Sequence, residues 1–196
     1  FHRGEGYTHH RLPAGTQVIY PNPALPALPD RRQAIEYALD HPLGDEPLDA
    51  QLRPGMKVTI AFDDVSLPLP RMQCPDVRQS VMEIVLERLD RAGVTDIELI
   101  CAICLHRRCT PAELKHFVGP VIFKRFWPKK LYNHDAEDPQ GNLLLGATTA
   151  GEVVEINRRA AESDLIIYVN INLVTMDGGH KSVPVGLATY RCVKHH

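Results

Sequence analysis

Two apolar segments separated by a stretch of helical length constrain the fold of this chain more than any other feature. Residues 56–62 and 96–104 are rich in aliphatic and β-branched side chains, as is typical of buried strands. Between them, a segment that begins at Asp76 places apolar residues on one helical face and stops at Gly93. This order predicts a right-handed βαβ unit whose two strands are parallel.

The other predicted elements alternate in the same manner. Asp30 is the expected N-cap of a short helix that stops at His41-Pro42, and Thr110-Pro111-Ala112-Glu113 combines a capping box with a proline at the first helical position. We also expect a short strand at 131–132, a hairpin of 143–146 with 153–157, a short helix over 158–162 and a buried strand over 164–170. The predicted fold class is therefore α/β, with a mostly parallel sheet and helices on both faces.

The N-terminal part differs in composition from the rest. Residues 1–20 contain short strand-like pieces, the last being 16–20, and the proline-rich stretch 21–29 is incompatible with regular structure. We expect residues 1–29 to form N-terminal strands and a strap that lies over a surface. Residues 30–196 are the predicted α/β domain.

Charge and cysteine content narrow the functional classes. Lys and Arg total 22 against 24 Asp and Glu, and this net charge of −2 gives no general attraction to nucleic acid or to anionic lipid. No apolar run reaches the roughly 20 residues of a membrane helix, and the first residues do not resemble a signal peptide. The five cysteines suit a reducing compartment. We expect a cytoplasmic protein without nucleic-acid or membrane partners.

Four polar loops follow the predicted strands, and functional residues of α/β folds gather at the carboxyl ends of strands. These loops span residues 63–70, 105–108, 133–135 and 175–181. We therefore expect the site to be assembled from them.

The last of these loops contains Gly178, Gly179, His180 and Lys181, followed by Ser182. Glycines allow backbone N–H groups to approach an anion, as in phosphate-binding loops. The spacing of a Walker A motif is absent, which disfavours nucleotide hydrolysis. Taken alone, the segment is equally compatible with a simple glycine turn.

His106 and His134 each lie in a polar loop, where a single histidine is most often only solvated. Two imidazoles at one rim of a sheet can exchange the roles of acid and base near neutral pH. Asp135 either orients a ring or ends a turn. The pair is thus a candidate for acid–base catalysis.

Cys101, Cys104 and Cys109 suggest a zinc or redox site, but Cys101 belongs to an apolar strand and no second C-x-x-C pair follows. Buried, inert thiols are the favoured interpretation.

Taken together, the loops resemble those of the nickel-dependent lactate racemase family. The matching stretches occur in family order from about residue 24 onward: Pro26-Ala27-Leu28-Pro29-Asp30, Asp64-x-Ser66-x-Pro68-x-Pro70, His106-Arg107 with Thr110-x-x-Glu113-Leu114, Asn133-His134-Asp135, Gly146-x-Thr148-x-x-Gly151 leading to Asn157, and Gly178-Gly179-x-Lys181-Ser182 with Gly186-Leu187-Ala188-x-Tyr190.

The resemblance implies a pincer cofactor, a pyridinium mononucleotide that is joined to a lysine and holds nickel. The matching lysine is Lys181, and the implied cofactor-binding residues are Gly178, Gly179, Ser182, Asp64 and Ser66. A histidine beyond the lysine completes the nickel coordination in the family. His195 or His196 takes this role here, or the ligand follows the sequence given.

The implied activity is racemisation or epimerisation of a 2-hydroxy acid. His106 and His134 match the two family histidines that act as acid and base on opposite faces of the substrate, while the α-hydride moves to the cofactor and back. The runner-up interpretation is a non-catalytic or cofactor-binding module of the same fold.

Three departures from the family pattern bear on the substrate. Leu67 stands where the family has a carboxylate-binding arginine, so Arg71, Arg107 or Arg108 would have to bind the carboxylate instead. Cys104-Leu105 precedes the first histidine where the family has Gly-Thr, and His180 precedes the lysine in place of arginine. We expect a larger or less polar substrate than lactate. The family also closes its site with a C-terminal domain, so we expect these residues to be inactive alone.

Overall fold

The computed structural model describes residues 2–3, 6–20, 22–23, 25–65, 72, 74–172 and 178–194. The helices are α1 (Arg31–Asp40), α2 (Leu48–Gln51), α3 (Val77–Arg91), α4 (Pro111–Phe126), α5 (Arg158–Ala161), α6 (Ser182–Leu187) and α7 (Tyr190–Val193), with a 3-10 turn η1 (Gly179–Lys181). The strands are β1 (His2–Arg3), β2 (Gly6–Tyr7), β3 (Lys57–Phe62), β4 (Asp96–Cys101), β5 (Leu131–Asn133), β6 (Asn142–Ala147), β7 (Val153–Asn157) and β8 (Leu165–Val169). Within the described residues, none of the helices has the length and apolarity needed to cross a bilayer.

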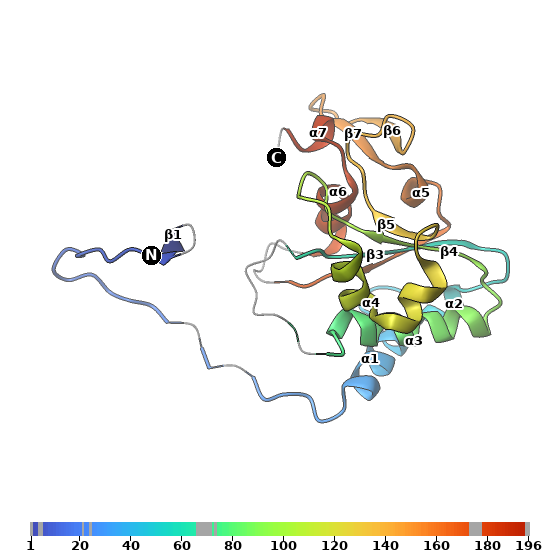
Figure 1. Ribbon diagram of the computed structural model, residues 1–196, viewed down its shortest axis with the longest axis horizontal. Helices are drawn as coiled ribbons and strands as arrows, with labels where there is room; N and C mark the ends of the chain where they lie inside the picture. Colours follow the sequence, from blue (N-terminus) through green and yellow to red (C-terminus); the bar gives the residue numbers. More distant parts are fainter. Residues whose placement is uncertain are drawn as a thin grey trace.

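A four-stranded parallel sheet in the order β5-β4-β3-β8 forms the centre of the fold (Figure 1). The predicted βαβ unit is present as β3-α3-β4, and α4 connects β4 to β5. The chain then returns to the other side of β3, where β8 completes the sheet. The strand order therefore reverses at β3, and its carboxyl end adjoins that of β8.

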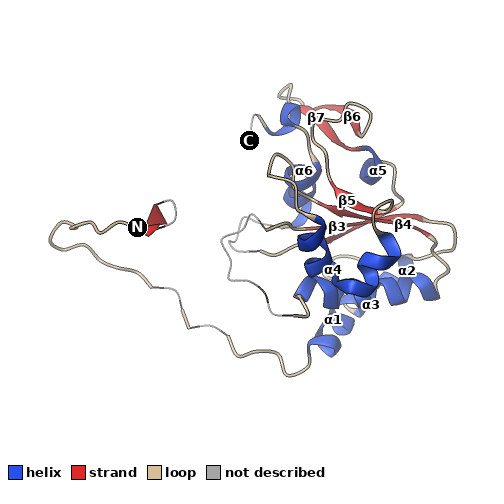
Figure 2. Ribbon diagram, viewed as in Figure 1, coloured by secondary structure: helices blue, strands red, loops and turns tan. Residues whose placement is uncertain are grey.

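Helices cover both faces of this sheet, as predicted from the sequence (Figure 2). On one face, side chains from β3 and β4 pack against α3 and α4 in the main core, which includes Phe62, Leu89, Leu99 and Phe117. On the other face, a smaller core around Ala61 and Ile100 packs against Ala160 of α5 and Leu187 of α6. The alternation of side chains along β3 supplies both cores.

The predicted helix caps are confirmed. Asp30 accepts a hydrogen bond from the Gln33 amide at the start of α1. At α4, Thr110 and Glu113 form the reciprocal capping box, with Pro111 in the first turn. The predicted hairpin is confirmed as the antiparallel pair β6-β7, which packs against α5 and α7.

The N-terminal predictions are partly wrong. Residues 16–20 are not a strand, and the antiparallel strand pair of this region is β1 with β2. The expected strap stays a prediction. The described part of residues 8–29 extends away from the body (Figure 1) and exposes Ile19, Tyr20 and Leu25. A short apolar stretch does not specify a pairing partner, so the strand predicted over residues 16–20 rested on local pattern alone.

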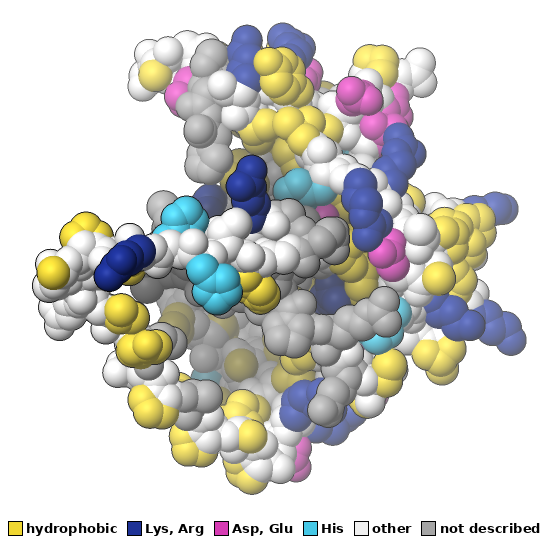
Figure 3. Space-filling view, turned by 60° about the vertical axis from the view of Figure 1, so that its left-hand side comes forward, with side chains coloured by type: hydrophobic (Ala, Val, Ile, Leu, Met, Phe, Trp, Pro, Cys, Tyr) yellow, Lys and Arg dark blue, Asp and Glu magenta, His cyan; other side chains and the backbone are white. Residues whose placement is uncertain are grey.

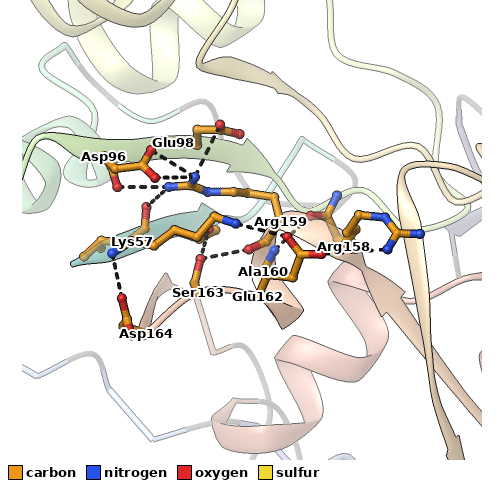
Figure 4. Close-up of polar contacts among 12 residues, drawn as sticks. Lys57, Asp96, Glu98, Arg158, Arg159, Ala160, Glu162, Ser163 and Asp164 are labelled. Carbon is orange, nitrogen blue, oxygen red and sulfur yellow. Dashed lines mark hydrogen bonds and ion pairs between the residues drawn. The ribbon is translucent and has the colours of Figure 1, made fainter. Parts of the chain in front are cut away.

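A polar network closes the amino-terminal edge of the sheet (Figure 4). The Arg159 guanidinium binds the Asp96 carboxylate at 3.0 Å and donates to the carbonyl oxygens of Val58 and Asp96. Lys57 contacts Glu162 nearby. These contacts fasten α5 to the amino-terminal ends of β3 and β4. The loops where a site is expected lie at the opposite ends of these strands.

Candidate functional site

The carboxyl ends of the parallel strands bring the predicted loops to one edge of the sheet. Asp63 and Asp64 follow β3, His106 follows β4, His134 follows β5, and Asn170 follows β8. In open α/β sheets, ligands bind beside the point where strand order reverses, which here lies between β3 and β8. Figure 3 looks toward this side of the molecule, with the N-terminal segment in front.

Asp64 and His106 form the most distinctive pair at this edge. Oδ2 of Asp64 lies 3.0 Å from Nδ1 of His106, and the carboxylate is buried whereas the His106 side chain is 52% exposed. A carboxylate at Nδ1 holds the proton there and turns Nε2 outward. The resemblance implied a cofactor-binding role for Asp64, which stays a prediction, and its side chain lies against His106.

A buried arginine fixes the backbone of the Asp63-Asp64 pair. Arg78 donates from Nη1 to the carbonyl oxygens of Asp63 at 2.6 Å and Asp64 at 3.0 Å. Its Nε and Nη2 bind the buried Asp76 carboxylate, and its guanidinium lies over the Phe117 ring at 3.9 Å. Because all three guanidinium nitrogens are engaged, Arg78 holds the end of β3 in one position.

Asp63 connects the end of β3 to the chain that follows β8. Its Oδ2 accepts hydrogen bonds from the Ile171 amide at 2.6 Å and the Asn170 side chain at 2.8 Å. Burial raises the pKa of Asp63, and these donors oppose that shift. The buried carboxylate thus fixes the chain directly after β8, which precedes the loop that ends in Lys181.

Glycines on both sides of Lys181 pack closely against β8 and the residues that follow it. Gly178 and Gly179 have φ values of 93° and 58°. A Cβ on Gly178 would lie 2.7 Å from the Asn172 side chain, and one on Gly186 would lie 2.3 Å from the Tyr168 hydroxyl. Glycine is therefore required at both points. Lys181 ends η1 immediately before α6 and is half-buried.

The carbonyl oxygen of Ala188 joins three of the loops. It accepts a hydrogen bond from Nε2 of His134 at 3.0 Å and one from the Cys104 thiol at 3.4 Å. The Cys104 amide also donates to the Gly186 carbonyl oxygen, and Cys104 itself has a positive φ of 44°. For a residue with a side chain this backbone conformation is uncommon. Residues 186–188, which follow Lys181 in the chain, are thereby fastened to the loops that carry His106 and His134.

Both ring nitrogens of His134 are engaged. Since a carbonyl oxygen can only accept, Nε2 carries the proton toward Ala188. Asn157 uses Oδ1 to accept the Ala160 amide, so its side-chain N–H group faces Nδ1 of His134 at 3.2 Å. The ring is fully buried, and burial lowers its pKa. His134 is therefore a neutral ring that bridges β7 and the α6–α7 segment.

The described candidate arginines have carboxylate partners. Arg107 forms a two-point ion pair with Glu113, at 2.7 and 3.0 Å, which lowers the pKa of Glu113 to about 2. Arg108 pairs with Asp135. The sequence suggested that Asp135 orients a ring or ends a turn. The structure adds an ion pair with Arg108 to these two possibilities. A substrate carboxylate would have to displace Glu113 to reach the fork of Arg107.

Five predicted residues lie outside the described part of the chain: Ser66, Leu67, Arg71, His195 and His196. Among the described residues, no three His, Cys, Asp or Glu side chains are grouped to hold a metal ion. All five cysteines are described and free, so the zinc interpretation of Cys101, Cys104 and Cys109 has no support. These three cysteines are buried, as the sequence predicted, whereas their expected inertness stays a prediction.

Sequence reasoning missed three residues that shape this edge. Arg78 was passed over because an arginine on a helix is usually solvated. Asn157 was noted only within a motif, and Ala188 acts through its backbone. The Asp76-x-Arg78 spacing at a helix start is a signal that could have revealed the buried ion pair, whereas nothing local marks the Ala188 carbonyl.

The fold and site define an α/β domain in which a histidine–aspartate pair and a glycine-flanked lysine lie in loops at the carboxyl edge of a parallel sheet. The chain belongs to the lactate racemase N-terminal domain family, whose model matches residues 4–196.

Two lactate racemases are among its relatives. That of Lactiplantibacillus plantarum is 27% identical over 168 residues, which is 83% of this chain and 37% of the relative. That of Thermoanaerobacterium thermosaccharolyticum is 22% identical over 164 residues, covering 81% of this chain and 36% of the relative. The chain thus spans less than two-fifths of the length of these racemases.

Two solved structures share the fold. The lactate racemase apoprotein from Thermoanaerobacterium thermosaccharolyticum superposes with a TM-score of 0.68 at 23% identity, covering 83% of this chain and 38% of that one. A Thermotoga maritima protein gives a TM-score of 0.53 at 17% identity, covering 84% and 41%. At these identities the likeness supports the α/β fold alone.

Proposed function

We propose that this chain forms the cofactor-bearing part of a racemase or epimerase of 2-hydroxy acids. The observation that carries the proposal is the Asp64–His106 hydrogen bond, at the same edge of the sheet as the loop that ends in Lys181. Membership of the lactate racemase family supports the reaction class. The length of the relatives supports a further C-terminal domain that completes the site.

His106 is the proposed acid–base group for the substrate hydroxyl. Its Nδ1 is occupied by Asp64, and its Nε2 has no hydrogen-bond partner among the described residues. With the proton of the neutral ring on Nδ1, Nε2 is a base that can take the hydroxyl proton and return it. Asp64 stabilises the imidazolium formed in between, because its carboxylate is buried and adjacent.

His134 is the proposed second acid–base group, for the opposite face of the substrate. In the conformation described, Nε2 is used by Ala188 and Nδ1 by Asn157. Acid–base action therefore requires one of these hydrogen bonds to open. The lowered pKa keeps the ring neutral, which suits a base that accepts a proton once it is released.

Lys181 is the proposed attachment point of a nickel-pincer nucleotide. The fit rests on local chemistry: Lys181 is half-buried and follows two glycines with positive φ, and a Cβ on Gly179 would meet nothing within 4 Å among the described residues. A planar group can therefore approach the backbone there. Ser182 can donate a hydrogen bond to it, and His195 or His196 is the proposed nickel ligand. When bound, the group supplies an electron sink for the α-hydride.

The test follows the α-hydrogen through the reaction. The full-length enzyme, produced together with the enzymes that build the cofactor and with nickel, is incubated with a single enantiomer of a 2-hydroxy acid in deuterium oxide. Hydride transfer within the site predicts racemised product that keeps its original hydrogen at C2. Deuterium at C2 would mean removal of the α-hydrogen as a proton and would contradict the mechanism. An inactive enzyme that carries the cofactor would favour the binding-module alternative.

A further inference from the structure

Cys101 and Cys109 flank the loop that carries His106, and their side chains contact each other. Their sulfur atoms lie 3.8 Å apart, with the Cys101 thiol donating to Cys109. Both side chains are buried and both cysteines are free. The two sulfur atoms are thus close neighbours within the fold, as a disulfide between them would require.

The backbone holds both cysteines close to their present positions. Cys101 ends β4 and pairs with Phe62 on one side and Asn133 on the other. Cys109 exchanges two hydrogen bonds with the Asn133 side chain, at 3.0 and 2.9 Å. Since Asn133 contacts both cysteines, their Cα atoms cannot separate without breaking this contact. Closing the gap between the sulfurs therefore depends mainly on side-chain rotation.

The two thiols are chemically unequal. The hydrogen bond from Cys101 lowers the pKa of Cys109, whereas the same bond and burial raise the pKa of Cys101. Cys109 also directly follows the exposed residues 105–108, whereas Cys101 lies inside the sheet. Cys109 is thus the thiol that a small oxidant reaches first.

We propose that Cys101 and Cys109 are a redox-active dithiol that a peroxide converts to a disulfide. The Cys109 thiolate attacks a peroxide oxygen and becomes a sulfenic acid, and for hydrogen peroxide the departing hydroxide leaves as water. The Cys101 sulfur then attacks that sulfenic sulfur, and the Cys101 proton leaves with the hydroxyl group as a second water. Two thiols and one hydrogen peroxide thus give one disulfide and two waters.

The dithiol adjoins the candidate acid–base pair. The negative charge of Asp64 raises the pKa of both thiols, and the nearby Val65 backbone lowers that of Cys109. The disulfide would close a short ring of chain around His106. Oxidation therefore alters the support of the Asp64–His106 hydrogen bond, and reduction restores it. The proposal does not depend on the reaction that His106 performs.

Peptide mapping tests directly whether peroxide joins Cys101 to Cys109. The protein is treated with hydrogen peroxide, its remaining thiols are blocked, and it is digested with trypsin. Cleavage after Arg107 and Arg108 separates peptide 92–107 from peptide 109–115. We expect the two to be recovered as one cross-linked species that dithiothreitol separates. The Cys104→Ala variant should keep the cross-link, whereas Cys101→Ala should lose it and leave Cys109 oxidised singly.

The opposite results are equally clear. The proposal fails if Cys109 passes to the sulfinic acid while Cys101 stays reduced in the unmodified sequence, or if the bond joins Cys104 to Cys109. It also fails if both thiols survive a peroxide dose that fully oxidises the exposed Cys74. Because the mapping uses no assay of racemisation, its outcome is independent of the proposed function.

Discussion

The carboxylate of Asp64 lies 3.0 Å from Nδ1 of His106, with the acid buried and half of the imidazole side chain exposed. A buried charge persists at such a position only when its surroundings satisfy it. Arg78 helps to fix the backbone on which this carboxylate is placed, by holding the carbonyl oxygens of Asp63 and Asp64. The orientation of His106 therefore depends on two buried residues, Asp64 and Arg78.

Replacing Asp64 by asparagine should lower kcat without removing substrate binding. The amide cannot balance the imidazolium, so we expect a loss of about 10²- to 10⁴-fold in kcat with KM changed much less. Steady-state kinetics of the cofactor-loaded full-length enzyme would measure this. Asp45→Asn, at an exposed loop position, is the matched control. A kcat equal to that of the parent enzyme would remove Asp64 from the acid–base assignment.

His134 should make the fold sensitive to mild acid. Burial holds its pKa below 6.5 in the folded state, so the unfolded chain binds the proton more readily and stability falls as pH decreases below 6.5. Urea titrations between about pH 5 and 7 should show a shallower decline for His134→Gln than for the parent, although the variant is less stable throughout. His9→Gln, in the exposed N-terminal segment, should leave the decline unchanged. Identical slopes for all three would show that His134 does not titrate on unfolding.

The Asp76–Arg78 pair should contribute strongly to stability. Both side chains are buried, so Arg78→Met leaves a carboxylate without its partner and should lower the free energy of unfolding by about 3–5 kcal/mol. Arg125→Met breaks the exposed pair with Asp90 and should cost about 0–1 kcal/mol. Urea denaturation of the two variants makes the comparison. Equal losses would mean that Arg78 is not the anchor of the β3 end.

Leu67 should disfavour small substrates. An arginine at this position can bind a carboxylate at two points, whereas leucine cannot. In the full-length enzyme we expect Leu67→Arg to shift kcat/KM toward small 2-hydroxy acids such as lactate. A competition assay with lactate and a larger 2-hydroxy acid measures the shift. An unchanged preference would show that another group already binds the carboxylate.

Much of the fold was predictable because its signals are local. The Thr110 capping box, the Asp30 N-cap and the alternating apolar pattern of residues 57–62 each specify a structure through neighbouring residues. The loop positions then followed from the parallel strands. The strand predicted over residues 16–20 was wrong because a short apolar run does not encode the strand it would pair with.

The partners within the site were not predictable in the same way. The contacts of His134 with Asn157 and Ala188 join residues separated by 23 and 54 positions. No periodicity or motif reports such a contact. Likewise, the apolar strand around Cys101 and the absence of a second C-x-x-C pair suggested inert thiols. Only the fold shows that the sulfur atoms of Cys101 and Cys109 lie 3.8 Å apart. Local patterns thus placed the loops, but the chemistry of each side chain depends on tertiary contacts.

The central claim is that Lys181 carries the cofactor, and the intact mass of the protein tests it most directly. The protein is produced in full length with the cofactor-building enzymes and nickel, as the parent, as Lys181→Arg and as the control Lys194→Arg, since Lys194 is exposed after α7. Arginine keeps the charge but cannot form the linkage to the cofactor. We predict a mass increment in the parent and in Lys194→Arg and none in Lys181→Arg, with the same thermal unfolding for all three. An increment that persists in Lys181→Arg would contradict the account, because the cofactor would then be attached elsewhere.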